Sequence, residues 1–171
     1  MHQKKIAVFP ASFDPVTNGH IDLIERILKL SIFDELILAV AVNPDKSSNF
    51  TIEERVEMLK EATKDYPNVV VESITGLTAR YAKKRGASVI IRGLRAFSDF
   101  DFELHLALTN RILAPDVDTL FLMSDDKYSH VSSTLVMQIA QIDKEFPEKE
   151  LAEMVPPSVI KKLRERHREI Q

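Results

Sequence analysis

The residues best suited to chemistry lie near the start of the chain, between Ser12 and His20. They follow a short apolar run at residues 6–9 and precede an amphipathic stretch at residues 21–30. We therefore expect a buried strand that leads through a loop into a helix opening near Gly19 and His20. A helix N-terminus presents unpaired N–H groups and a partial positive charge, which can hold a phosphate group. An imidazole at the mouth of such a site can donate a hydrogen bond to an oxyanion, so His20 is a candidate catalytic residue.

Four other apolar runs are also followed by groups that suit phosphate. In a parallel sheet the carboxyl ends of the strands meet at one edge, and ligands bind beyond that edge. Five separate segments would deliver polar side chains to the same place, which favours a binding site more strongly than any one of them. The groups are Ser12 and His20 after residues 6–9, Lys46 after 36–42, Thr78 after 69–71, Arg92 and Arg95 after 89–91, and Ser129 to Thr134 after 119–123.

Apolar runs and stretches with helical spacing alternate along the chain. This alternation predicts right-handed βαβ crossovers, and the continuous apolar runs predict strands that are covered on both faces. No internal repeat or linker interrupts the pattern. We expect an α/β fold, a single Rossmann-like domain over residues 1–171 with a five-stranded parallel sheet and helices on both faces.

Local signals mark where several helices begin and end. Thr51 and Glu54 have the spacing of a capping box, and Gly86 follows a basic stretch as a C-terminal cap should. Ser132 is placed to cap another helix. A further helix is expected to begin at Ser98-Asp99.

The C-terminal part differs in composition from the rest. Pro156 and Pro157 predict a break, and residues 159–168 predict a final helix rich in Lys, Arg and Glu. We expect this helical tail, from about residue 156, to be solvated, to fray at its tip and to carry no chemistry.

Composition excludes several classes of protein. The chain has 171 residues and no cysteine, so neither a disulfide framework nor a cysteine metal site is possible. The net charge of −3 gives no basic surface for nucleic acid, and the apolar runs are too short for a membrane span or a signal peptide. Asp99 and Asp101 suit a solvated first helical turn better than a metal site, so no metal-binding residue is predicted. We expect a cytoplasmic protein without nucleic-acid or membrane partners.

Each candidate also has a purely structural interpretation. His20 can simply cap or pack at its helix start, and Lys46 in a loop favours plain solvation. Arg92 and Arg95 flank Gly93 at a strand end, where we favour a phosphate clamp over two solvated arginines. Of the three hydroxyls at residues 132–134 one is needed as a cap, and a phosphate on the others is an open alternative.

Several motifs make the chain similar to a known family. Residues 10–15 together with Thr17-Asn18-Gly19-His20 resemble the T/HxGH signature of the nucleotidyltransferase superfamily. Ile91-Arg92-Gly93-Leu94-Arg95 and Val131-Ser132-Ser133-Thr134 narrow this resemblance to the phosphopantetheine adenylyltransferases. The resemblance runs in register from the first strand to about residue 142.

The resemblance implies a role for each matching residue. His20 would contact the ATP phosphates and stabilise the transition state, and Ser12 would contact both substrates. Lys46, Thr78 and Arg92, with Ser12, would bind phosphopantetheine. The ATP-binding residues would be Ser12, Phe13, His20, Gly93, Leu94, Arg95, Glu103, Tyr128, Ser129, His130, Val131, Ser132, Ser133 and Thr134.

The implied activity belongs to coenzyme A biosynthesis: adenylyl transfer from ATP to 4′-phosphopantetheine, giving dephospho-coenzyme A and pyrophosphate. The attacking phosphate is already anionic near neutral pH, so direct in-line attack needs neither a general base nor a covalent intermediate. The family implies Mg²⁺ held mainly by the ATP phosphates, a homohexamer, and feedback inhibition by coenzyme A. Alternatives are a related nucleotidyltransferase for nicotinamide mononucleotide or a small phospho-alcohol, a nucleotide-binding sensor without turnover, and a flavodoxin-like interaction domain.

Overall fold

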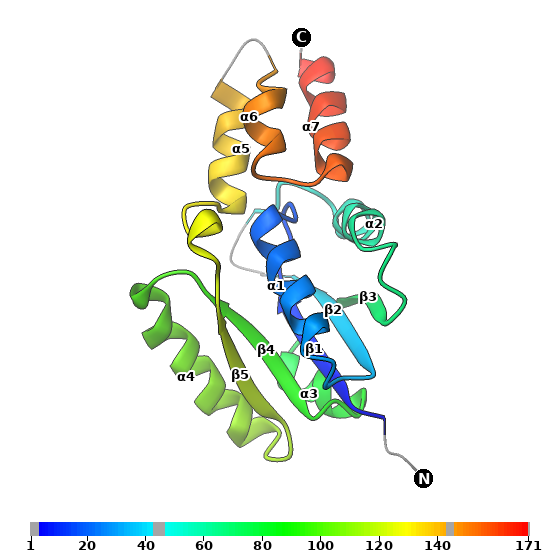
Figure 1. Ribbon diagram of the computed structural model, residues 1–171, viewed down its shortest axis with the longest axis vertical. Coiled ribbons are helices and arrows are strands. Elements are labelled where there is room, and N and C mark those ends of the chain that lie inside the picture. Colours follow the sequence, from blue (N-terminus) through cyan, green and yellow to red (C-terminus); the bar gives the residue numbers. More distant parts are fainter. Residues whose placement is uncertain (1–3, 43–46, 143–145, 171) are drawn as a thin grey trace.

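A five-stranded parallel sheet forms the centre of the computed structural model, which describes residues 4–42, 47–142 and 146–170. The strand order β3-β2-β1-β4-β5 means that the chain builds outward from β1 in one direction and then crosses back to add β4 and β5 (Figure 1). This arrangement confirms the predicted Rossmann-like α/β fold. The strands are β1 (Ile6–Ala11), β2 (Glu35–Ala41), β3 (Val69–Ile74), β4 (Val89–Leu94) and β5 (Asp118–Met123).

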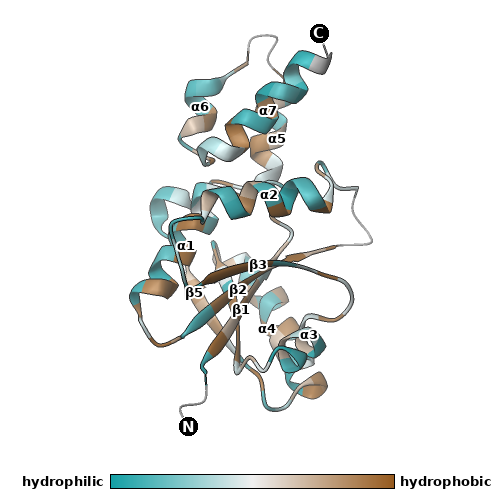
Figure 2. Cartoon of the chain, turned by 90° about the vertical axis from the view of Figure 1, so that its right-hand side faces the viewer, coloured by the Kyte–Doolittle hydropathy of each residue, from teal (hydrophilic) through white to brown (hydrophobic). Residues whose placement is uncertain are grey.

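Different helices cover the two faces of the sheet, because successive side chains of a strand point to opposite sides. One apolar core joins the sheet to α1, α2, α5, α6 and α7, and a second joins it to α3 and the end of α4. Figure 2 shows the apolar strands between these layers. The helices are α1 (Asn18–Lys29), α2 (Ile52–Ala62), α3 (Thr78–Lys84), α4 (Phe97–Leu113), the 3₁₀ turn η1 (Asp126–Tyr128), α5 (Ser133–Ile142), α6 (Glu148–Ala152) and α7 (Pro157–Ile170).

The alternation along β4 decides where its last residues point. Ile91 packs in the core that contains α1, and Ile90 packs in the core that contains α3. Gly93 therefore faces α1 and Arg92 faces α4. A Cβ atom at Gly93 would lie 2.5 Å from Cδ1 of Leu23, so the glycine lets α1 approach the end of this strand closely.

Most helix ends expected from the sequence are present. The Thr51 N–H donates to the Glu54 carboxylate at 2.9 Å and the Glu54 N–H donates to the Thr51 hydroxyl at 3.2 Å, which completes the capping box of α2. Gly86 follows α3 with a φ of 68°, the left-handed conformation of a C-terminal glycine cap. The Ser132 hydroxyl accepts the Leu135 N–H at 3.1 Å, so Ser132 caps α5 as predicted.

Strand β5 and the start of α4 differ from the prediction. The continuous apolar run of β5 predicted burial on both faces, but β5 is an edge strand that leaves Leu120 43% and Met123 56% exposed. α4 begins at Phe97, one residue before Ser98, and Ala96 at its N-cap forms no side-chain cap. An apolar surface therefore remains open along α4 and β5.

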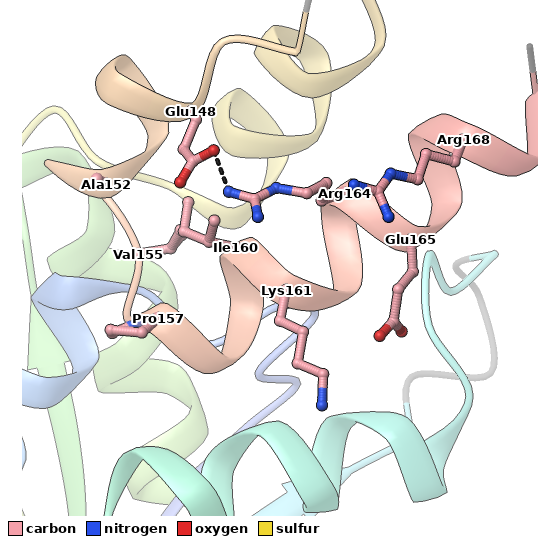
Figure 3. Close-up of a pocket in the computed structure, with 9 residues that line it drawn as sticks. All are labelled: Glu148, Ala152, Val155, Pro157, Ile160, Lys161, Arg164, Glu165 and Arg168. Atoms are coloured by element: carbon pink, nitrogen blue, oxygen red, sulfur yellow. Dashed lines mark ion pairs between the residues drawn. The ribbon is translucent and has the colours of Figure 1, made fainter.

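The C-terminal part packs as a helical layer and is not the solvated tail that its charge predicted. Val159 and Leu163 of α7 are buried, and α7 contacts α2, α5 and α6. In Figure 3, Arg164 of α7 points to Glu148 of α6 and forms an ion pair with it at the rim of a hollow. The apolar face of α7 thus outweighs its charged composition.

None of the helices in the described ranges is long and apolar enough to cross a membrane.

Candidate active site

A cleft of about 260 Å³ opens beyond the carboxyl ends of β1 and β4. These neighbouring strands lie where the strand order reverses, which is where open α/β sheets bind their ligands. The cleft therefore has the position that the sequence analysis expected. The predicted site residues that line it are Ser12, His20, Arg92, Gly93, Arg95, Tyr128, Val131, Ser132, Ser133 and Thr134.

His20 is held in place by the first turn of its own helix. α1 begins at Asn18, slightly earlier than expected, with Thr17 as its N-cap and His20 at the third helical position. The Nδ1 atom of His20 accepts the Thr17 N–H at 3.0 Å and lies 2.9 Å from the Thr17 hydroxyl oxygen. Because Nδ1 uses its lone pair in this bond, the proton of the neutral ring is on Nε2. The ring lines the cleft with an N–H group available as a donor.

Burial keeps the His20 ring neutral. The ring packs against Phe13, with 5.0 Å between the ring centroids, and Phe13 itself is fully buried behind the cleft. Two causes lower the pKa of His20 from 6.5 to about 4: loss of hydration, which is the larger, and the positive charge of Arg95. At neutral pH His20 is therefore an uncharged hydrogen-bond donor.

The two arginines at the end of β4 have different partners. Arg92 donates from Nε and Nη2 to the Glu103 carboxylate at 2.6 and 2.7 Å, and from Nη1 to the Pro10 carbonyl oxygen at 2.9 Å. Arg95 donates its backbone N–H to Asp99 at 3.1 Å, and its Nε lies 3.5 Å from the same carboxylate. Each guanidinium borders the cleft but is oriented by a carboxylate of α4.

The three hydroxyl residues at the start of α5, Ser132, Ser133 and Thr134, have different roles. Ser132 caps the helix, and the Ser133 hydroxyl donates to the Pro15 carbonyl oxygen at 2.7 Å. The second bond ties the loop after β1 to the start of α5. Thr134 is exposed at the cleft. Two of the three hydroxyls thus position the loops, and the third faces the solvent.

The other predicted residues that the structure describes do not line the cleft. Thr78 is the first residue of α3, and Leu94 is buried at the end of β4. Glu103 is 8% exposed on α4. Ser129 and His130 are exposed in the turn before α5. Lys46 lies outside the described residues.

Two residues that the sequence analysis did not assign hold the loops of the cleft together. Arg55 of α2 is 2% exposed, and its Nη1 donates to the carbonyl oxygens of Ser12 and of the last residue of β2, at 3.0 and 3.4 Å. The Asp14 carboxylate accepts the N–H groups of Asn49 and Phe50 at 2.7 and 2.9 Å. The sequence did hold one sign of a buried role for Arg55, because this cation lies on the apolar face of a helix with a clear capping box.

Known proteins resemble the chain over nearly its whole length. Residues 8–139 match the family described as cytidylyltransferase-like. The phosphopantetheine adenylyltransferase of Desulforamulus reducens is 49% identical over 163 residues, which cover 95% of this chain and 97% of the relative. The phosphopantetheine adenylyltransferase of Caldanaerobacter subterraneus is 50% identical over 162 residues, with the same coverage of each chain.

A solved structure shares the fold at low identity. Nicotinic acid mononucleotide adenylyltransferase of Plasmodium falciparum, in complex with NaAD, aligns with a TM-score of 0.68 at 14% identity and covers 93% of this chain and 94% of its own. That likeness extends the agreement in architecture to a nucleotidyltransferase far removed in sequence. From the motifs, the cleft and the identity of about half of all residues, we conclude that the chain belongs to the phosphopantetheine adenylyltransferase family of cytidylyltransferase-like proteins.

Proposed function

We propose that the chain transfers the adenylyl group of ATP to 4′-phosphopantetheine in the cytoplasm, releasing dephospho-coenzyme A and pyrophosphate. The observation that carries this proposal is the neutral Nε2 donor of His20 in a cleft lined by hydroxyl and guanidinium groups. Such groups suit polyanionic substrates. The family to which the chain belongs supports the same reaction.

The surroundings of His20 argue for direct transfer without a covalent intermediate. Its unprotonated nitrogen, Nδ1, is occupied by Thr17 and cannot act as a base toward Ser12. Thr17, which borders the cleft, is only 2% exposed, and its hydroxyl is held at the His20 ring and the His20 N–H. The chain also contains no cysteine nucleophile. The acceptor phosphate is an anion near pH 7 and can attack the α-phosphorus in line without a base.

Alignment and charge supply the catalysis in this mechanism. Two anions must be held together against their repulsion, and positioning of this kind contributes up to about 7–11 kcal/mol. His20 then donates to an oxygen of the α-phosphate as negative charge develops there. Arg95, whose charge acts on His20, and the N-terminus of α1, which carries His20 in its first turn, add positive potential there. We also assign a phosphate contact to Lys46, as the resemblance implies.

Mg²⁺ enters this proposal bound to ATP. Within residues 4–42, 47–142 and 146–170, no group of three or more His, Cys, Asp or Glu side chains could hold a metal ion. The cleft offers donors of hydrogen bonds, which fit phosphate oxygens better than a cation. Mg²⁺ dehydrates reluctantly and often binds through substrate phosphates and water, where it neutralises their charge.

The pH dependence should reveal the neutral form of His20. We expect kcat/KM, which reports the ionisation of the substrate-free enzyme, to stay flat from about pH 7 to pH 8.5, because a ring with a pKa of about 4 keeps its Nε2 proton throughout this range. Steady-state pyrophosphate release tests this, and NMR titration of the His20 ring in the substrate-free protein should give a pKa near 4.

A charged imidazolium would give the opposite profile. It would lose its extra proton as pH rises, and kcat/KM would fall about tenfold per pH unit above the pKa of the ring. Stability gives a second check, since the unfolded chain binds a proton at His20 below about pH 6.5 and the folded chain does not. Stability should thus decrease from pH 6.5 toward pH 4, and less so in His20→Gln.

An apolar surface on α4 and β5 supports assembly with further copies of the chain. Phe97 is 92% and Ile112 80% exposed at the two ends of α4, with Phe102 65% and Leu108 53% exposed between them. Uncovered apolar patches of this kind mark interfaces. We propose a homo-oligomer through this surface, and a homohexamer as the family implies.

Ile112→Glu should dissociate this assembly. The charge would be buried without a partner in the interface, a cost of several kcal/mol, whereas in a monomer it stays in water. Light scattering coupled to size exclusion should give a hexamer for the wild type and smaller species for the variant. Leu30→Glu, at an apolar residue that is 52% exposed on the far side of the sheet, is the matched control and should stay assembled. A monomeric wild type would contradict the proposal.

Coenzyme A is the proposed feedback inhibitor. It contains the adenylyl and the phosphopantetheine parts of the product and can occupy both substrate positions at once. Inhibition that weakens as either substrate is raised would support this assignment.

One assay tests the proposed reaction against its alternatives. The protein is incubated with ATP, Mg²⁺ and one acceptor at a time, and pyrophosphate is measured. Pyrophosphate release with 4′-phosphopantetheine, and with none of the other acceptors, supports the proposal. Release with nicotinamide mononucleotide or a phospho-alcohol instead identifies a related nucleotidyltransferase, and binding of ATP without release identifies a sensor.

A further inference from the structure

The ion pair between Arg92 and Glu103 is the closest contact between charged groups at the cleft. Both oxygens of the carboxylate accept from the guanidinium, at 2.6 and 2.7 Å, in a two-point geometry that fixes its plane. The side chains are only 23% and 10% exposed. Pro10 accepts a third hydrogen bond from Nη1 at 2.9 Å. Arg92 is thus held in one orientation before any substrate binds.

Glu103 lies on the opposite side of the sheet from the lining around His20. Arg92 faces α4, whereas its neighbour Gly93 faces α1. Glu103 does not line the cleft, and its carboxylate is directed to Arg92. The resemblance assigned Glu103 to ATP, but these contacts connect it to the residue expected to hold the phosphate of phosphopantetheine.

The remaining donors of Arg92 suit a phosphate group. A guanidinium has five N–H bonds, and three of them are used by Glu103 and Pro10. One N–H on Nη1 and one on Nη2 have no partner among the described residues. We propose that Glu103 is a positioning residue, which holds Arg92 so that this free pair of N–H groups faces the phosphate of the acceptor substrate. This inference rests on the proposed function.

The ion pair also lowers the entropy cost of binding the acceptor. A free arginine side chain loses rotamer freedom when it grips a phosphate, and a guanidinium already held loses less. The Glu103 charge balances that of Arg92, so the partly buried cation is compensated while the site is empty. Loss of Glu103 should therefore weaken acceptor binding although the carboxylate does not touch the acceptor.

A double-mutant cycle on Arg92 and Glu103 tests this role. We expect Glu103→Ala to raise the KM and the calorimetric Kd for 4′-phosphopantetheine by up to about 100-fold, as misplacement of a binding group does, with the KM for ATP within about twofold of the wild type. Arg92→Ala should weaken the same affinity. In the Arg92→Ala background, Glu103→Ala should have no further effect, because nothing remains to be positioned.

The controls separate positioning from general stability. Glu35→Ala removes a carboxylate that is 14% exposed and pairs with Arg85 at the opposite end of the sheet, and it should leave both KM values unchanged. If Glu103→Ala does not fold, Glu103→Gln replaces it, since the amide keeps the shape and loses one acceptor. A raised KM for ATP, or effects that add in the double variant, would overturn the inference.

Failure of the proposed function would look different. Wild-type protein that releases no pyrophosphate contradicts the reaction, but calorimetry with 4′-phosphopantetheine or inorganic phosphate still measures the Arg92 site. Phosphate binding that depends on Arg92 and Glu103 jointly would support the inference even then. Binding that ignores both residues would overturn it.

Discussion

Replacement of His20 by alanine is expected to lower kcat by about 100- to 1,000-fold, the usual effect of removing one hydrogen-bond donor to a developing oxyanion. The donor is the Nε2–H group, whose position follows from the bond between Nδ1 and Thr17. Because the contact strengthens only as charge develops on the α-phosphate, the KM for ATP should change little. Single-turnover measurement of pyrophosphate release gives the chemical step directly.

His20→Ala also removes a helix cap, so the experiment needs a control for folding. The side chain accepts the N–H of Thr17 in the capping box of α1, a contact worth about 1 kcal/mol. Glu54 has the same position in the capping box of α2, away from the cleft. Glu54→Ala, which also removes an ion pair with Arg166 at 3.3 Å, should reduce stability by at least as much and leave kcat near the wild-type value. Equal losses of kcat in both variants would show that His20 acts only through structure.

The fold was predictable because its signals are local. Buried parallel strands read as continuous apolar runs, and caps such as Thr51 with Glu54 are decided within four residues. The prediction was wrong for β5 and α7. An edge strand and a covered strand have the same composition, and the apolar face of a charged helix is buried only if a partner such as α2 is available.

The candidate site was predictable in position but not in its internal contacts. Strand ends brought Ser12, His20 and Arg95 to one cleft, as the topology required. The partner of Arg92 comes from a helix 11 residues further along, and Arg55 reaches Ser12 across 43 residues. Such pairs depend on how helices pack on the sheet, and no local pattern encodes them. The pKa of His20 likewise depends on tertiary burial, whereas its tautomer follows from the local bond to Thr17.

Phe13→Ala should have the largest effect on stability and should also change His20. Phe13 is fully buried between Phe9 and His20, with ring centroids 5.8 and 5.0 Å away. Loss of a buried phenyl ring costs about 3–5 kcal/mol in the free energy of unfolding, which urea denaturation measures. Water admitted beside the imidazole would weaken the main cause of its low pKa, so the pKa of His20 should rise from about 4 toward 6.5.

Ile27→Ala is the matched control, because Ile27 lies in the same core and is 1% exposed on α1, two helical turns beyond His20. It should cost about 2–5 kcal/mol and leave the pKa of His20 near 4, as NMR titration of the ring would show. The backbone at Phe13 has a φ of 46°, a conformation that residues other than glycine rarely adopt. Burial of the phenyl ring therefore offsets local strain, and its contact with the imidazole shields that part of His20 from water. An unchanged pKa in Phe13→Ala would mean that the other neighbours of the ring and Arg95 keep it neutral, and the effect of Phe13 on catalysis would then be structural only.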